Sequence, residues 1–182
     1  MEAGDIMSDL SVDKEKELEM LHKVKSYKKI NSTYDEENNQ IQLKLILQDC
    51  AMSPCYNIKG NVLLLSDRLY GIALGLQYFF VNHTKATVLD IADNYETALM
   101  AVQKRNIDLL IIAGYQKSRS NYKIIDYLEK RGRTRTVMWA VLDKYIDTIC
   151  YQYHINYKFE RTEPLSLFAD YLIRNHLLEC EK

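Results

Sequence analysis

From residue 61 onward, short apolar runs alternate with amphipathic stretches of helical spacing, and this alternation most limits the possible folds. The apolar runs are residues 61–67, 86–92, 107–113, 136–141 and 155–160. The stretches that follow them are residues 71–83, 94–106, 120–132, 143–153 and 164–178. Five strand–helix units of this kind predict a parallel sheet covered by helices on both faces. We therefore expect a doubly wound, five-stranded α/β domain over residues 60–182.

A domain of this size and order has the dimensions of a flavodoxin-like fold. Such folds place their functional site at the carboxyl ends of the strands. The residues to consider there are Ser66, Asp67, Arg68, Ala113, Gly114, Ala140, Val141, Glu160 and Arg161.

Residues 1–59 are predicted to form an N-terminal extension. It contains eleven acidic and eight basic side chains, so it is acidic overall. Residues 1–12 are expected to be disordered. Residues 13–30 are expected to form a helix, because Asp13 can cap it and acids fill its first turn.

An apolar stripe runs along the expected helix 13–30. It consists of Leu18, Leu21, Val24 and Tyr27, and it predicts packing on the main domain or on a partner helix. Beyond it, residues 31–40 are expected to be a polar loop. Residues 41–47 alternate in the manner of a strand, although a short helix is also possible, and residues 48–60 are expected to be a linker.

Composition favours a globular domain and gives no general signal for nucleic-acid or membrane binding. Of the 182 residues, 47% are hydrophobic, which is enough to bury a core, and the formal net charge is only −1. No apolar run reaches the length of a membrane span. The first residues are acidic, unlike a secretory signal, so we expect a cytoplasmic location without membrane contact.

The cysteines offer little evidence for a metal site or a nucleophile. Cys50 and Cys55 lie close in sequence but lack a second ligand pair, so reduced thiols are expected rather than a zinc site. Cys150 and His154 could touch, although Cys150 is expected to pack as a small apolar residue. No catalytic motif or phosphate-binding loop is present, so we predict neither an enzyme nor a bound cofactor or metal.

Three segments resemble the receiver domain of bacterial two-component response regulators, of the type found in LuxR/NarL-class transcription factors. The segments are VLLLSDRLYGIALGLQYFF, ADNYETALMAVQKRNIDLLII and ERTEPLSLFADYLI. The resemblance covers about residues 60–176 and lacks the helix-turn-helix that follows the receiver in that class. It implies the CheY-like variant of the doubly wound fold and a role in signal transduction.

The resemblance also implies where receiver chemistry would lie. A receiver holds Mg²⁺ with two acids at the positions of Ser66 and Asp67, and it accepts the phosphoryl group on an aspartate at the position of Ala113. A Ser or Thr and a Lys complete the site, at the positions of Ala140 and Glu160 here. Lys158 or Arg161 could replace the lysine only in a shifted register. We therefore expect the receiver fold without its phosphoryl chemistry.

A receiver without chemistry can still present a surface, so we predict phosphorylation-independent regulation through protein contacts. Tyrosines concentrate in one region, at Tyr145, Tyr151, Tyr153 and Tyr157, and tyrosine is enriched in interfaces. A transcription factor, a sensor kinase or a second copy of the chain is the expected partner.

Two further functions remain open from the sequence. One is direct DNA binding through seven basic residues in positions 117–135, where Asp126 and Glu129 are the acids. The basic residues are Lys117, Arg119, Lys123, Lys130, Arg131, Arg133 and Arg135. The other is sensing of a small ligand in a flavodoxin-like pocket.

Overall fold

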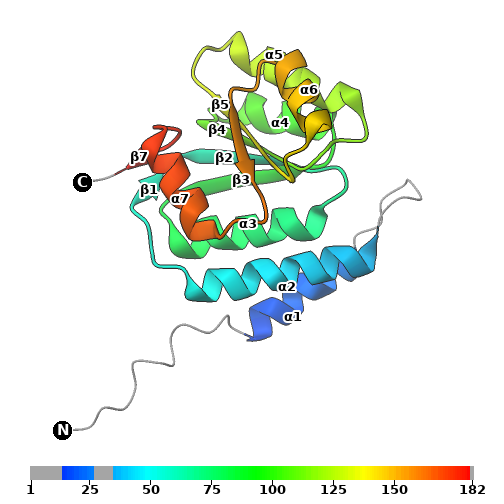
Figure 1. Cartoon of the computed structure of the whole chain (residues 1–182), viewed down its shortest axis with the longest axis vertical. Helices are drawn as coiled ribbons and strands as arrows, with labels where there is room; N and C mark the ends of the chain where they lie inside the picture. The colour runs from blue at the N-terminus through cyan, green and yellow to red at the C-terminus, as the bar shows by residue number, and fades with distance from the viewer. Residues whose placement is uncertain (1–13, 27–34, 181–182) are drawn as a thin grey trace, which may run out of the picture.

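A five-stranded parallel sheet forms the centre of the computed structural model, which describes residues 14–26 and 35–180. The strand order is β3-β2-β4-β5-β6, and helices cover both faces (Figure 1). The strands are β2 (Asn61–Leu65), β3 (Thr87–Ala92), β4 (Leu109–Ala113), β5 (Arg135–Ala140) and β6 (Tyr157–Glu160). The predicted doubly wound α/β fold is confirmed.

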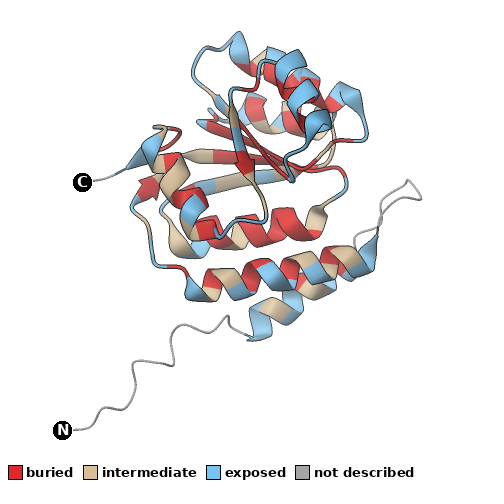
Figure 2. Ribbon diagram, viewed as in Figure 1, coloured by how far each residue is buried: buried red, intermediate tan, exposed pale blue. Residues whose placement is uncertain are grey.

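The central strands are apolar on both faces because both faces are covered. In β2, Val62 and Leu64 belong to the cluster formed with α3 (Tyr70–His83) and α7 (Leu165–Arg174). Leu63 and Leu65 belong to the opposite cluster. Figure 2 shows the buried strands between the inward faces of the helices.

The second face of the sheet is covered by three helices and a short 3₁₀ turn. They are α4 (Tyr95–Lys104), η1 (Arg119–Tyr122), α5 (Lys123–Glu129) and α6 (Lys144–Gln152). Asn94 and Asp143 cap α4 and α6, since their side chains accept the backbone N–H of Thr97 and Ile146.

The N-terminal extension contains a long helix that sequence reasoning missed. Helix α2 (Glu36–Met52) replaces the strand expected at 41–47, part of the loop expected at 31–40 and part of the linker expected at 48–60. Helical spacing decides the outcome, because Leu43, Ile46, Leu47 and Cys50 are buried together. Two residues of the expected strand, Ile41 and Leu45, are instead 50% and 54% exposed.

Helix α2 packs so closely on α3 that two glycines are required at the contact. A Cβ on Gly71 would lie 2.1 Å from the backbone oxygen of Asn39, and a Cβ on Gly75 would lie 2.6 Å from Cγ2 of Ile46. The buried Asn39 completes the contact, because its Oδ1 accepts the Gly71 N–H at 2.8 Å. Its Nδ2 donates to the carbonyl of Arg68 at 3.2 Å.

The far end of α2 contacts α7. The Asp49 carboxylate accepts the backbone N–H of Leu165 at 2.6 Å, at the first turn of α7. That N–H has no intrahelical acceptor, so the bond both caps α7 and fixes α2 against it.

Helix α1 is described over Lys14–Ser26, within the helix expected at 13–30. Of its expected apolar stripe, Val24 is buried and Leu21 packs against the same cluster. Met20 and Val24 are buried with Leu43 and Leu74, whereas Leu18, expected to face inward, is 68% exposed. The predictions for residues 1–13 and 27–34, Tyr27 included, lie outside the described residues.

The chain ends differently from the helix expected at 164–178. Helix α7 ends at Arg174, and His176 adopts a positive φ of 52°. Leu177 and Leu178 then return to the core. They lead into β7 (Glu179–Cys180), which pairs antiparallel with β1 (Ile58–Lys59).

The α2–α3 contact predicts an order of stabilities for two glycine substitutions. Gly71→Ala places its Cβ against backbone, which cannot move away, so we expect a loss of about 2–4 kcal/mol despite the better helix propensity of alanine. Gly75→Ala meets only a side chain and should cost less. Urea unfolding of both variants checks this, and an unchanged Gly71→Ala midpoint would contradict the packing described.

Candidate functional site at the carboxyl edge of the sheet

Five residues singled out from the sequence lie at one edge of the sheet. Ser66 and Asp67 follow β2, and Ala113, Ala140 and Glu160 end β4, β5 and β6. These four strands are parallel neighbours, so their carboxyl ends meet at the same edge. Ala113 and Ala140 are buried and offer only methyl groups there.

Asp67 ties the end of β2 to the loop that follows β4. It is only 4% exposed. Its Oδ2 accepts the backbone N–H groups of Lys117 at 2.7 Å and Ser118 at 3.2 Å. The side-chain amide of Asn121 approaches the same oxygen at 3.5 Å. Oδ2 of Asp67 therefore holds the loop that follows β4.

Gln116 fills the space between β2 and β4, and sequence reasoning missed it. The side chain is fully buried. Its Oε1 accepts the backbone N–H of Asp67 at 3.0 Å, and its Nε2 donates to the carbonyl of Gly114 at 3.2 Å. A single glutamine two residues after Gly114 carries no sequence pattern that distinguishes it from a surface residue.

A second set of buried groups holds Gln116 in place. The Tyr122 hydroxyl accepts the backbone N–H of Gln116 at 3.1 Å, and burial raises the pKa of Tyr122 above its usual value. Asn121 accepts the N–H of Tyr95 at 3.0 Å, which connects this network to the start of α4. Ser66 is also used locally, since its Oγ accepts the Leu69 N–H at 3.0 Å.

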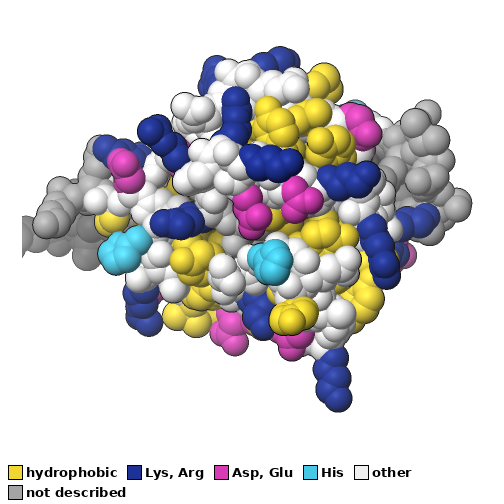
Figure 3. All heavy atoms as spheres, turned by 90° about the horizontal axis from the view of Figure 1, so that it is seen from above, with side chains coloured by type: hydrophobic (Ala, Val, Ile, Leu, Met, Phe, Trp, Pro, Cys, Tyr) yellow, Lys and Arg dark blue, Asp and Glu magenta, His cyan; other side chains and the backbone are white. Residues whose placement is uncertain are grey.

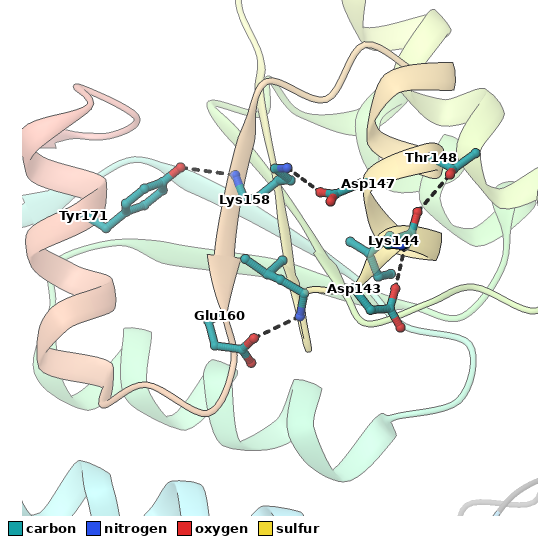
Figure 4. Close-up of polar contacts among 9 residues, drawn as sticks. Asp143, Lys144, Asp147, Thr148, Lys158, Glu160 and Tyr171 are labelled. Atoms are coloured by element: carbon teal, nitrogen blue, oxygen red, sulfur yellow. Dashed lines mark hydrogen bonds and ion pairs between the residues drawn. The ribbon is translucent and has the colours of Figure 1, made fainter.

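Glu160 supports the loop between β5 and α6 (Figure 4). Its carboxylate accepts the backbone N–H of Leu142 at 2.9 Å and that of Thr162 at 3.2 Å. The bond from Leu142 is the main reason why the pKa of Glu160 lies below its usual value.

Lys158 and Arg161, the two residues that could replace the receiver lysine in a shifted register, lie in different surroundings. Lys158 extends from β6 toward α6 and pairs with Asp147 at 2.5 Å. Its backbone N–H donates to the Tyr171 hydroxyl, as Figure 4 shows. Arg161 instead lines a cavity at the carboxyl edge. Its backbone N–H donates to the carbonyl of Ala140 at 3.0 Å.

That cavity has a volume of about 550 Å³ and lies between α2, the end of β4 and the start of α6. Its polar lining includes Arg68, Arg161, Asp35 and Asp143. Among residues 14–26 and 35–180, no group of three or more His, Cys, Asp or Glu side chains is placed to hold a metal ion.

The predicted interface tyrosines divide into two kinds. Tyr151 is 86% exposed and Tyr145 is 46% exposed. Tyr153 stacks on Tyr122 with ring centroids 4.6 Å apart, and Tyr157 packs against the core. Two of the four side chains are thus well placed to meet a partner.

The basic residues of 117–135 are all exposed but lie at both edges of the sheet. Lys117 and Arg119 follow the carboxyl end of β4, whereas Arg133 and Arg135 lie at the amino end of β5. Arg131 is engaged within the protein, because its Nη1 donates a hydrogen bond to the carbonyl of Val102 at 2.6 Å. Figure 3 shows Lys and Arg side chains interspersed with hydrophobic and neutral groups on one face.

The four cysteines are free thiols, two of them buried and two exposed. Cys150 is buried, and burial raises the pKa of its thiol to about 11, which disfavours the nucleophilic thiolate. Burial likewise raises the pKa of Cys50 to about 12, while Cys55 is exposed. Within the described part of the chain, no helix is both long enough and apolar enough to cross a membrane.

Comparison with known proteins identifies the fold. No protein-family model matches the sequence, and no curated protein matches it. A DNA-binding response regulator of the LuxR family from Staphylococcus aureus superposes with a TM-score of 0.54 at 8% identity, over 63% of this chain and 97% of that chain. The chain has the receiver fold.

Two more solved structures support the same fold. RcsB from Salmonella enterica serovar Typhimurium, bound to promoter rprA, has a TM-score of 0.53 at 10% identity, over 65% of this chain and 60% of that chain. The signal receiver domain of an HD domain-containing protein from Pseudomonas fluorescens Pf-5 has a TM-score of 0.51 at 17% identity, over 65% and 97%. At these identities the likeness shows the fold alone.

Removal of the Asp67 carboxylate should destabilise the protein. Asp67→Ala leaves the N–H groups of Lys117 and Ser118 without an acceptor, at a cost of about 2–3 kcal/mol. Asp67→Asn keeps one acceptor oxygen and should cost less. Urea unfolding measures both, with the exposed Asp126→Ala as the control. Equal stability of Asp67→Ala and Asp126→Ala would refute the structural role.

The lowered pKa of Glu160 predicts a pH-dependent contribution to stability. A carboxyl with a lowered folded-state pKa stabilises the fold above its unfolded value of about 4.3, and the stabilisation is lost as the pH falls through the folded value. We expect Glu160→Gln to cost about 0.5 kcal/mol at pH 7, because the group is largely solvated, and nothing in acid. Unfolding at several pH values tests this, with the exposed Glu163→Gln as the comparison variant.

Proposed function

We propose that this protein is a receiver-like regulator that acts through protein contacts and does not depend on phosphorylation. Its pathway would be signal transduction or the control of transcription. The main support is the pair Asp67 and Gln116 at the place where a receiver performs its chemistry. The Asp67 carboxylate binds the loop after β4, and Gln116 of that loop binds the backbone of Asp67.

The methyl group of Ala113 has no oxygen to accept a phosphoryl group. Ala140 likewise lacks the hydroxyl that would follow that group, and the carboxylate of Glu160 would repel its charge. A phosphoryl-driven rearrangement also needs mobile loops, whereas here Gln116 and Glu160 secure the loops by hydrogen bonds. These features together favour a surface whose shape is constant.

The proposed partner surface is the β5–α6 surface, defined here as Val141, Leu142, Tyr145 and Tyr151. All four side chains are exposed hydrophobic or aromatic groups. Buried aromatic anchors supply much of the binding energy of protein interfaces. A chain of the CheX-CheY complex from Borrelia burgdorferi has a similar fold, with a TM-score of 0.50 at 14% identity. That complex is an example of a protein of this fold bound to another protein.

Direct DNA binding is the second candidate, and the exposed basic residues of 117–135 favour it. RcsB, which has a similar fold, was solved bound to a promoter. The match covers only 60% of the RcsB chain. The distribution of the basic residues over both edges of the sheet makes one continuous phosphate footprint less favourable. We therefore place protein contact first.

A pull-down from native lysate of the source organism, with and without nuclease, tests this proposal. We expect a stoichiometric protein partner that survives nuclease. Leu142→Ser with Tyr151→Ser should weaken its capture about tenfold or more, and acetyl phosphate with Mg²⁺ should change neither capture nor intact mass. The control is Leu167→Ser, which replaces an exposed apolar side chain on α7.

Three results would contradict the proposal. They are a partner that vanishes with nuclease, a gain of one phosphoryl group in the intact mass, and equal capture by the double variant and wild type. The first of these would favour nucleic-acid binding instead, which a steep salt dependence of DNA affinity would establish.

A further inference from the structure

The cavity at the carboxyl edge of the sheet has the size of a small-molecule site. Its volume is about 550 Å³, within the usual range for ligand pockets. About half of its lining residues are apolar or aromatic, among them Leu69, Ala140, Val141, Tyr145 and Ile146, and most of the others are polar or charged. Gly114 and Ala140, both buried, contribute only small groups to its walls.

Arg161 gives the cavity its charge preference. The side chain is half-buried, and its guanidinium makes no hydrogen bond or ion pair with any residue in the described ranges. Burial lowers the pKa of this group, which reflects the cost of keeping the charge partly out of water. The adjacent Glu160 attracts this charge without a direct ion pair, and its carboxylate accepts the N–H groups of Leu142 and Thr162.

Two acidic residues also line the cavity, but both are exposed and cap the helices that they precede. Asp35 accepts the N–H of Asn38 at the start of α2, and Asp143 accepts the N–H of Ile146 at the start of α6. The formal charges of the lining therefore cancel, whereas the charge that lies partly out of water is the positive one on Arg161. An anionic group on a ligand would supply the ion-pair partner that this arginine lacks among residues 14–26 and 35–180.

Aromatic rings continue the site on the side of α6. Tyr115 and Tyr145 meet edge to face with centroids 5.1 Å apart, and the guanidinium of Arg68 lies 6.0 Å from the Tyr115 ring centroid. A flat apolar group can lie against such rings while its charged end reaches an arginine.

We propose that this cavity binds a small organic anion, with one carboxylate or phosphate group on a flat apolar body. The binding is non-covalent, so it needs none of the receiver chemistry that the site lacks. The inference goes beyond the proposed function and does not depend on it.

The N-terminal extension forms one wall of this site. Asp35, which caps α2, and Asn38 and Asn39 of its first turn line the cavity beside Arg68. The amide of Asn39 donates to the carbonyl of Arg68 and accepts the N–H of Gly71. A bound anion would therefore contact both the receiver fold and α2.

The test is a titration of the full chain with four probes, followed by backbone amide NMR shifts. Phenyl phosphate and benzoate carry the required anion on a ring, while benzyl alcohol and benzylamine carry a neutral and a cationic group. We expect saturable shifts at Gly114, Tyr115 and Val141 with the two anions, with a dissociation constant on the order of 1 mM. Arg161→Met should weaken binding about tenfold or more.

Matched variants keep the result interpretable. Arg174→Met replaces an exposed arginine at the end of α7, outside the cavity, and should bind as wild type does. If Arg161→Met does not fold, Arg68→Met removes the exposed arginine of the same cavity and should weaken binding in the same direction. Absence of saturation, equal binding of benzyl alcohol or benzylamine, or unchanged affinity in the cavity variants would overturn the proposal.

Discussion

The hydrogen bonds among Asp67, Gln116 and the loop after β4 close the carboxyl edge of the sheet, and the arrangement of the site depends on them. Parallel strands leave backbone groups and loop ends exposed at this edge, and buried polar groups must find partners there. Asp67 accepts the N–H groups of the loop, while Gln116 connects the ends of β2 and β4. These bonds involve Oδ2 of Asp67 and the side-chain amide of Gln116, and they join segments about fifty residues apart in the chain.

Helix α2 gives this receiver fold an added layer outside α3. Its contacts are specific in shape, because Gly71 and Gly75 allow the two helices to approach, and specific in polarity, because Asn39 and Asp49 bond to α3 and α7. Its first turn also reaches the cavity at the carboxyl edge. The extension is therefore part of the candidate site as well as of the packing.

The two proposals use different parts of one edge of the molecule. Leu142 and Tyr151 belong to the partner surface only, whereas Arg161 and Tyr115 belong to the cavity only. Val141 and Tyr145 are common to both, so an occupant of the cavity would lie next to a bound partner. This proximity would let a small anion influence protein contact without any covalent change.

The sequence by itself determined the five strands, the helices between them and the positions at the strand ends, because apolar runs and helical spacing are local patterns. It could not identify α2, since Ile41, Leu43 and Leu45 alternate as a strand does while the buried set follows helical spacing. Only tertiary packing on α3 decided between them. The hydrogen bonds of Gln116 and the position of Arg161 in the cavity also came from the structure alone, because both depend on segments far away in the chain.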